Sequence, residues 1–256
     1  MRIIISPAKT MRELPDSPYA ATSPVFIEKT NILKNHIRSL TFEEQKKLWS
    51  CNDKIAQQNV ERFTNMGNGA KITPAIMAYD GIQYSNISPE TLDAGEMEYL
   101  QEHLRILSGF YGVLKPLDGI MSYRLEMQSK AAVDGYKNLY EFWGESLYRE
   151  VVPQDGVIID LASKEYSKCI KKHLRSNDRF ISVTFGELIN GKLVQKGVYA
   201  KIARGEMVRY LAKLRACYPE QLRSFCACGY KINKERSSNE QYVFIRTSAQ
   251  HEGEYT

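Results

Sequence analysis

Two short, wholly apolar runs place the strongest constraint on the fold of this chain. Ile3–Ile5 ends at Ser6-Pro7, and Val157–Ile159 ends at Asp160. Apolar runs of this length, without alternating polar residues, indicate buried strands, and the proline marks the end of the first one. We therefore expect two buried strands, the first delivering Lys9 into a loop and the second delivering the segment DLASKEY, residues 160–166.

Helices and strands interleave along the chain without a regular alternation. Helical patterns cover 25–63, 96–107, 164–174 and 203–216, with Thr41 and Glu44 spaced as a capping box and Ser163 placed as an N-cap. Asn190-Gly191 between apolar runs predicts a hairpin, 230–232 and 242–245 suggest a second one, and 73–84 is ambiguous. The pattern favours an α/β (mixed α+β) fold with a central mixed sheet and flanking helices rather than a doubly wound parallel sheet.

Length and composition favour one unit. The 256 residues, 43% of them apolar, contain no long Gly/Ser/Pro-rich linker and no internal repeat, so we expect a single compact domain over 1–256. The apolar runs are too short for a membrane span, and the start MRIIISPAKT is too short in apolar residues for a secretory signal. Five irregularly placed cysteines suit a reducing compartment, and we expect a cytoplasmic protein.

The charge is unevenly distributed. Residues 1–159 hold 17 Lys/Arg against 20 Asp/Glu, whereas residues 160–256 hold 18 against 10. The two parts therefore carry −3 and +8. A clustered positive charge fits a polyanion such as nucleic acid, because lysine and arginine neutralise phosphates, although a solvated basic surface gives the same pattern.

Two predicted helices account for much of this positive charge. Their basic residues recur at three- and four-residue spacing, so several share one side of each helix. The alternative for either helix is an ordinary solvated face. Together they predict a shared basic groove, or cleft, formed by Lys164, Lys168, Lys171, Lys172 and Arg175 on the first helix, and by Lys201, Arg204, Arg209, Lys213 and Arg215 on the second.

The block Leu104–Met127, LRILSGFYGVLKPLDGIMSYRLEM, combines a helical pattern with two close glycines. A helix, a glycine turn and a second apolar stretch are one way to present backbone amides to DNA phosphate. The usual helix-hairpin-helix pattern has one apolar residue between its glycines, whereas Phe110 and Tyr111 both intervene here. We interpret the block as a helix-hairpin-helix-like element or an ordinary packed turn, with Gly109, Tyr111, Gly112 and Lys115 as candidate DNA contacts.

The ends of the two predicted strands carry the candidate chemistry. Lys9 and the segment 160–166 lie where α/β proteins commonly bind ligands. A lysine beside a carboxylate serves as a base or nucleophile when burial lowers its pKa, and Arg124 with Glu126 is suited to hold an anion. The same residues also suit a purely structural ion-pair network. The pocket candidates from this reasoning are Lys9, Arg124, Glu126, Ser163, Glu165 and Tyr166.

Metal and cofactor signals are weak. The chain has neither the GxxxxGKS/T phosphate loop nor a GxGxxG motif after a strand. Cys217, Cys226 and Cys228 offer at most three thiolates without a suitably spaced fourth ligand. We predict no metal site and no cofactor.

Five motifs resemble the bacterial YaaA family of peroxide stress proteins in order and spacing. They are IIISPAKT, the 104–127 block, FWG at 142–144, DLASKEY and YAKIARG at 199–205. The resemblance implies a cytoplasmic protein that limits damage from unincorporated iron and binds DNA through a positively charged cleft, with Leu104–Leu114 as its helix-hairpin-helix-like element. It also adds Arg204 to the pocket candidates. Relatives tend to have Glu-Gly-Tyr where this chain has Cys228-Gly229-Tyr230.

The resulting expectation is a DNA-binding protein of the peroxide stress response. Its contacts should be mainly to the backbone, largely independent of sequence, and sensitive to salt. No reaction transfers from the resemblance. An enzyme acting on DNA or a nucleotide through the Lys/Glu pocket and an iron-sequestering protein are the alternatives, and a monomer without membrane contact is the expected state.

Overall fold

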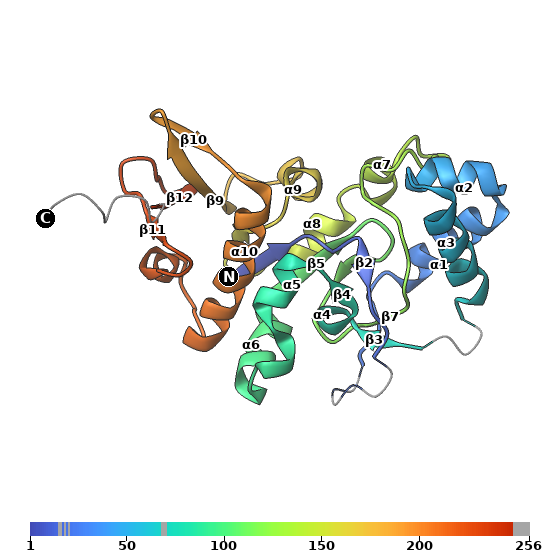
Figure 1. The fold of residues 1–256 in the computed structure, drawn as a ribbon, viewed down its shortest axis with the longest axis horizontal. Coiled ribbons are helices and arrows are strands. Elements are labelled where there is room, and N and C mark those ends of the chain that lie inside the picture. The colour runs from blue at the N-terminus through green and yellow to red at the C-terminus, as the bar shows by residue number, and fades with distance from the viewer. Residues whose placement is uncertain (15–16, 18, 20, 68–70, 248–256) are drawn as a thin grey trace, which may run out of the picture.

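A mixed sheet lies at the centre of the computed structural model, which describes residues 1–247 except 15–16, 18, 20 and 68–70 (Figure 1). Within the described residues the sheet has eight strands in the order β11-β12-β9-β8-β1-β5-β6, and β10 pairs with β9. The bounds are β1 Arg2–Ile5, β5 Leu104–Ser108, β6 Gly112–Leu114, β8 Val157–Asp160, β9 Arg179–Ile189, β10 Lys192–Val194, β11 Tyr230–Ile232 and β12 Gln241–Arg246.

The five inner strands β12, β9, β8, β1 and β5 are parallel, whereas β6, β10 and β11 pair antiparallel. Ile3 of β1 lies opposite Leu104 on one side and Ile159 on the other. Ile3, Ile4 and Ile5 are all completely buried. Both predicted buried strands are therefore confirmed, and with them the mixed α/β class.

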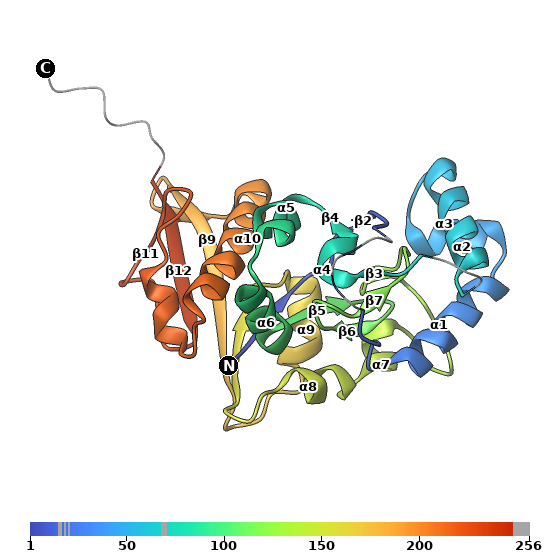
Figure 2. The same cartoon turned by 90° about the horizontal axis from the view of Figure 1, so that it is seen from below.

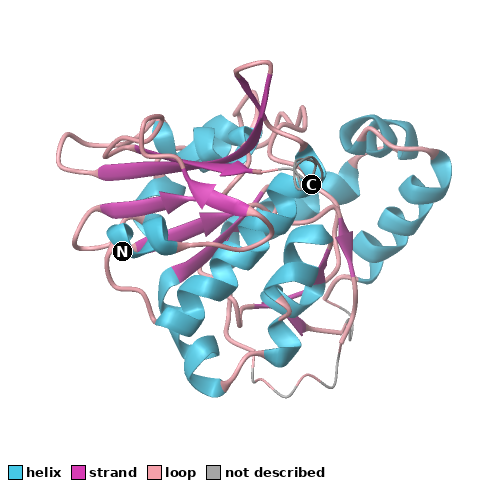
Figure 3. Cartoon of the chain, turned by 60° about the vertical axis from the view of Figure 1, so that its left-hand side comes forward, coloured by secondary structure: helices cyan, strands magenta, loops and turns pink. Residues whose placement is uncertain are grey.

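Helices cover both faces of the sheet (Figure 3). α8 packs against α9, whereas α10 packs against α5 and α6, and Figure 2 shows α8 and α9 below β1 with α5 and α10 above it. The helices of this layer arrangement are α5 Ile82–Ile87, α6 Ala94–His103, α7 Leu139–Trp143, α8 Ser146–Val151, α9 Lys164–Lys171 and α10 Gly197–Leu214, with the 3-10 helices η1 Pro89–Thr91 and η2 Pro219–Ser224.

A group of three helices stands beside the sheet at the right of Figure 1: α1 Ile27–Ser39, α2 Phe42–Trp49 and α3 Asp53–Asn65. The predicted capping box of Thr41 and Glu44 is present at the start of α2. Phe63 of this group stacks on Trp49 at 5.7 Å between ring centroids and meets Phe110 edge-on at 5.3 Å. The helical group therefore shares one hydrophobic core with the sheet.

The segment 73–84, which the sequence left ambiguous, forms short elements of both kinds. β3 Thr73–Pro74 pairs with β7 Gly119–Ile120, and β4 Tyr79–Asp80 pairs with β2 Thr10–Met11. The single-turn helix α4 Ala75–Ala78 connects β3 to β4, and α5 follows β4 directly. These small sheets join the segment after β1 to the segment that leads into Arg124.

Both hairpins expected in the last third of the chain are present. Asn190 and Gly191, with φ of 50° and 72°, connect β9 to the antiparallel β10, and β11 pairs antiparallel with β12. Left-handed backbone at both turn residues is the geometry that an Asn-Gly hairpin requires. The second strand of this hairpin is short, because β10 ends at Val194 and α10 begins at Gly197.

The helix-hairpin-helix expectation is wrong for Leu104–Leu114. The helix α6 ends at His103, Leu104–Ser108 is strand β5, and Gly112–Leu114 is the antiparallel strand β6. The helical spacing of Leu100, Leu104 and Leu107 is overridden because β5 pairs with β1 in the interior of the sheet. Two helices joined by a short turn do occur elsewhere, at α2 and α3 with residues 50–52 between them.

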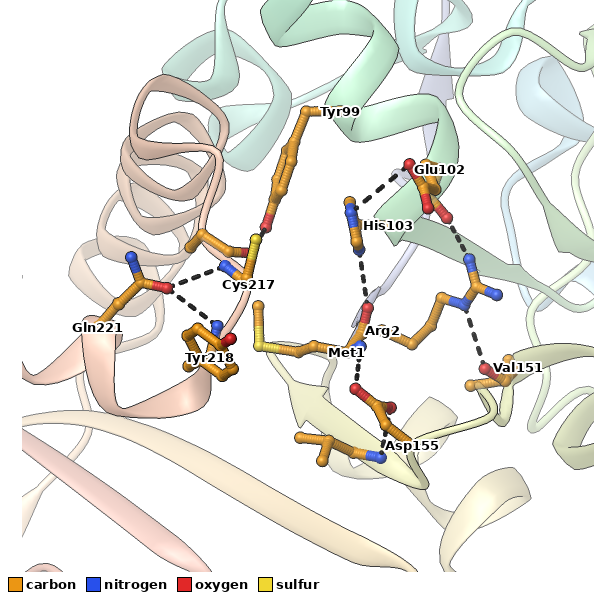
Figure 4. Close-up of polar contacts among 12 residues, drawn as sticks. Met1, Arg2, Tyr99, Glu102, His103, Val151, Asp155, Cys217, Tyr218 and Gln221 are labelled. Carbon is orange, nitrogen blue, oxygen red and sulfur yellow. Dashed lines mark hydrogen bonds and ion pairs between the residues drawn. The ribbon is translucent and has the colours of Figure 1, made fainter.

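The amino end of β1 is held by a network of polar contacts (Figure 4). The amino group of Met1 lies 2.6 Å from Asp155 Oδ2, and His103 Nδ1 lies 2.9 Å from the Met1 carbonyl. The Arg2 guanidinium donates to the carbonyls of Glu102 and Val151. This end of the strand is occupied by structural contacts, so the opposite, carboxyl end is the one open to a ligand.

Candidate functional site

A cavity of about 480 Å³ lies at the carboxyl ends of β1 and β8. The residues that follow these two strands form part of its wall, as expected for ligand sites of α/β sheets. All seven pocket candidates line this one cavity, although they come from four separate parts of the chain. They are Lys9, Arg124, Glu126, Ser163, Glu165, Tyr166 and Arg204, and Lys201 lines it with them.

The two strand ends are joined by a pair of serines. The backbone amide of Ser163 donates to Ser6 Oγ at 2.8 Å, and Ser6 Oγ donates to Ser163 Oγ at 3.2 Å. Tyr84 OH donates to the Ser6 carbonyl at 2.9 Å. Ser163 occupies the N-cap position of α9, as predicted, but its side chain contacts Ser6 and does not cap the helix.

One carboxylate binds two cations at the cavity. Glu126 Oε2 lies 2.9 Å from Lys9 Nζ, and Glu126 Oε1 lies 3.3 Å from Arg124 Nη2. The Lys9 side chain is 65% exposed, whereas those of Glu126 and Arg124 are 20% and 16% exposed. Lys9 is therefore an ion-paired cation at the mouth, and Arg124 lies deeper.

Glu165 is the second carboxylate of the cavity wall. Burial raises its pKa, and the nearby charge of Glu126 raises it further, against the hydrogen bond from the Gln128 amide and the charge of Lys9. The Gln128 amide donates to Glu165 Oε1 at 3.1 Å. A carboxylate with a raised pKa is suited to proton transfer to or from a bound ligand, or to a hydrogen bond with it.

Arg204 enters the cavity from α10. Burial lowers the pKa of Arg204, against the attraction of Asp160. Asp160 itself accepts hydrogen bonds from the Ala162 amide at 3.0 Å and from Ser167 Oγ at 2.7 Å. Within the described residues, neither a hydrogen bond nor an ion pair involves the Arg204 guanidinium, and its Nε is buried. Among the described residues, the Arg204 guanidinium thus has a nearby acidic group, Asp160, but no directly bonded acceptor.

Gly205 explains how Arg204 reaches this position. A Cβ at Gly205 would lie 2.3 Å from the Gln83 carbonyl oxygen and 2.8 Å from Asn86 Cβ, both on α5. The glycine lets α10 approach α5 closely, and Gln83 also lines the cavity. The close contact between the two helices therefore places Arg204 and Gln83 in the same wall.

The glycine hairpin of the 104–127 block packs against the segment that carries Arg124 and Glu126 into the cavity wall. A Cβ at Gly109 would lie 2.5 Å from the Leu125 carbonyl oxygen, so the glycine lets the segment 124–127 pass directly over the turn. Ser108 Oγ accepts from the amides of Phe110 and Tyr111, and Trp143 Nε1 donates to the Gly109 carbonyl at 3.0 Å. The hairpin therefore positions Arg124 and Glu126.

Three of the four expected DNA contacts of this hairpin, Gly109, Tyr111 and Gly112, are buried. Tyr111 is 1% exposed, its hydroxyl accepts from the Met121 amide at 3.1 Å, and Gly109 and Gly112 are buried. Lys115 is exposed but lines a different cavity, together with Asp118 and Glu150. In this conformation the three hairpin residues lie inside the core, which the sequence pattern did not reveal.

The two basic helices, α9 and α10, lie on different sides of the sheet (Figure 2). They approach one another at the cavity, through residues 163–166 at the start of α9 and through Lys201 and Arg204 near the start of α10. The starts of the two helices therefore share this cavity, and a longer basic groove between them stays a prediction.

Several of the predicted DNA-binding cations have partners within the protein. Arg209 Nη1 donates to the carbonyls of Ile87 and Ser88 and to Thr91 Oγ1, so it ties α10 to η1. Lys168 lies over the Tyr140 ring at 4.7 Å from its centroid, and Lys171 donates to Ser182 Oγ at 3.0 Å. Arg175 Nη2 lies 3.4 Å from Glu145 Oε1, and Arg204 lies in the cavity wall. The remaining cations of the two helices are exposed and are Lys164, Lys172, Lys201, Lys213 and Arg215.

Other cavity residues were missed by sequence reasoning. Tyr84 and Tyr123 are 3% and 4% exposed and line the cavity, and Tyr123 OH lies 2.7 Å from both Ser108 Oγ and Tyr79 OH. Gln83 lines it from α5. The nearest local signal in the sequence is the turn dipeptide Asp80-Gly81, after which α5 begins.

No cluster of three or more His, Cys, Asp or Glu side chains arranged for a metal ion is present among the described residues. Likewise, none of the described helices is long and apolar enough to cross a membrane.

Fold and cavity define an α/β protein with a mixed sheet. Its cavity is lined by charged and aromatic side chains and lies at the carboxyl ends of the central strands β1 and β8. The sequence model of the family described as "Peroxide stress protein YaaA" matches residues 1–236. Similar curated proteins, each called a UPF0246 protein, come from Agathobacter rectalis (48% identical, covering 97% of this chain and 100% of the relative) and Lachnoclostridium phytofermentans (46%, covering 96% of each). The chain belongs to the YaaA family of peroxide stress proteins.

Proposed function

We propose that this protein binds DNA during the peroxide stress response and so helps limit the damage that unincorporated iron causes. The main support for this proposal is the set of exposed cations around the cavity mouth. Lys9 and Lys201 line the cavity and are exposed, and Lys164 begins the helix whose first turn forms its wall. Residues 160–256, which contain Lys164 and Lys201, supply the positive charge of the chain.

Cations of this kind bind the phosphate backbone and read no base sequence. A strand that crosses the cavity mouth would contact Lys9 from the loop after β1 and Lys201 from α10. The chemistry of iron damage fits such contacts, since lysines bound to phosphates displace metal cations from the same oxygens. The family description supports the stress role, and the charge around the mouth supports the DNA contact.

Fluorescence anisotropy with duplex, forked and single-stranded DNA tests this proposal. Binding at low salt that weakens strongly at physiological salt is the expected result. The double variant Lys164→Ala/Lys201→Ala should bind less tightly, whereas Lys34→Ala, which removes a partly exposed lysine of α1 outside the cavity wall, should bind like the wild type. Absence of salt-sensitive binding to all three DNA forms would overturn the proposal.

An enzymatic activity on a bound nucleotide is the second candidate function. It is favoured by Glu165, a carboxylate whose pKa is raised by burial and which lines the cavity beside the Lys9–Glu126 pair. Such a group acts as a general acid or base when a ligand is in reach. Product analysis after incubation with DNA or nucleotides tests it. A new product that Glu165→Gln abolishes, with DNA affinity unchanged, would establish the enzyme.

A further inference from the structure

Three buried N–H groups in the cavity wall have no hydrogen-bond acceptor within the described residues. They are Nε of Arg204 on α10, Nε of Arg124 in the segment after β7, and Nε2 of Gln83 on α5. All three residues line the same cavity, and Gln83 is only 7% exposed. Buried donors are nearly always paired in folded proteins, so a group of three in one wall calls for an acceptor from outside the chain.

Three acceptors of the same wall are already engaged, and the exposed carboxylate of Asp80 lines the cavity as well. Glu126 holds Lys9 and Arg124, and Glu165 Oε1 accepts from the Gln128 amide. Ser6 Oγ accepts from the Ser163 amide. With Glu126, Glu165 and Ser6 engaged, the three unpaired donors are the complement of a ligand rich in acceptor oxygens. A phosphate group has that character and carries the negative charge that a partly buried guanidinium favours.

The rest of the wall is apolar and aromatic. Tyr84, Tyr123 and Tyr166 line the cavity, together with Leu125 and Ile82. The hydroxyl of Tyr84 is bonded to the Ser6 carbonyl and that of Tyr123 to Ser108 and Tyr79, so these groups are not free to bind a ligand. What they offer is ring and aliphatic surface, which suits a flat heterocycle. The cavity volume of about 480 Å³ is in the range of small-molecule pockets.

We infer that the cavity binds one nucleotide, with its phosphate on Arg204, Arg124 and Gln83 and its base against the tyrosines. The proposed DNA contact is not required, because a free nucleotide enters the cavity without a strand. The shared chemistry is a phosphate joined to a nucleobase, and either a free nucleotide or one unit of a nucleic acid strand supplies it.

The fold explains why these donors remain available. Close contact between α10 and α5 at Gly205 fixes the spacing of Arg204 and Gln83, and Gly109 fixes the segment that carries Arg124. Asp160, the acidic group that attracts Arg204, is itself 7% exposed and bonded to Ser167 and Ala162. The site is thus built from rigid contacts between helices and strands, which is the condition for a preorganised ligand site.

Isothermal titration of the whole chain with deoxyadenosine 5′-monophosphate, deoxyadenosine and inorganic phosphate tests the inference. The monophosphate should bind about ten-fold or more tightly than the nucleoside, because the phosphate meets three donors. Arg204→Gln should remove that advantage. Lys231→Ala, which removes an exposed cation of β11, should bind all three ligands like the wild type.

Two further variants test the inference if Arg204→Gln fails to fold. Arg204→Lys retains the charge but not the planar fork, and Gln83→Leu removes a neutral donor, so each should weaken the monophosphate more than the nucleoside. Displacement of the monophosphate by a short single strand identifies a strand as a source, and lack of displacement identifies the free nucleotide.

Equal affinity for nucleoside and monophosphate, no binding of either, or unchanged binding by folded variants would overturn the inference. Nucleotide binding without any DNA binding would leave it standing and refute the proposed function alone. The two claims therefore fail independently.

Discussion

Lys9 Nζ lies 2.9 Å from Glu126 Oε2, and the same carboxylate binds Arg124 through its other oxygen. Because this one acid neutralises two cations at the cavity, Glu126→Gln should release both for an anionic ligand. We expect DNA affinity at low salt to rise about two- to five-fold, in line with the modest strength of partly exposed ion pairs. Anisotropy titrations measure the change.

The matched control for this variant is Glu61→Gln, which removes an exposed carboxylate from α3. Both variants change the net charge by the same amount, so their comparison separates a local effect from a general one. Equal affinities of the two variants would contradict a role for the Lys9–Glu126 contact.

The raised pKa of Glu165 predicts a pH-dependent stability. The folded protein takes up this proton at higher pH than the unfolded chain does, chiefly because burial opposes the charge. Below the ordinary pKa of 4.5, Glu165 therefore has no effect on the free energy of unfolding. The protein loses stability as the pH rises from there through the raised pKa of this group. Glu165→Gln should unfold at a higher temperature than the wild type at pH 7, with the difference shrinking towards pH 4. Thermal unfolding between these pH values checks it, and a difference that grows towards pH 4 would contradict it.

Gly205 should tolerate no side chain. Gly205→Ala places a methyl group 2.3 Å from the Gln83 carbonyl oxygen and should cost about 1–3 kcal/mol, despite the better helix propensity of alanine. Gly197→Ala in the same helix meets no atom within 4 Å and should be neutral or slightly stabilising. Chemical denaturation measures both. Similar stabilities of the two variants would show that α10 and α5 are not held at this distance.

The glycine turn makes a comparable stability prediction. Gly112 has φ of 76°, and a Cβ there would lie 2.8 Å from the Trp143 ring. Gly135 has φ of 80° but no atom within 4 Å of an added Cβ. Both alanine variants carry the backbone strain, so Gly112→Ala should lose about 1–3 kcal/mol more than Gly135→Ala, through the clash alone. Equal unfolding midpoints in denaturant would argue against a packed turn.

The sequence predicted the parts of the site that depend on local signals. The apolar runs before Ser6 and Asp160 located two strand ends, and polar residues after them, Lys9 and Glu165, do line one cavity. Helix signals located α9 and most of α10. These predictions succeed because burial and capping are expressed in neighbouring residues.

The rest depends on contacts between distant segments. Leu104 and Leu107 have helical spacing, yet they belong to a strand because β1 pairs with them. Gln83 carries no local sign of a site, and only the approach of α10 at Gly205 brings it beside Arg204. The two glycines 109 and 112 indicated a turn correctly, but their burial against residues 125–127 and Trp143 could not be predicted from the pattern.

The salt dependence of DNA binding tests the central claim most directly. The logarithm of affinity should fall linearly with the logarithm of salt concentration, and Lys9→Ala/Lys201→Ala should reduce the slope by about two, one for each phosphate contact removed. Lys34→Ala should leave the slope unchanged. A slope that is the same in all three proteins, or binding that does not respond to salt, would contradict a DNA contact beside the cavity.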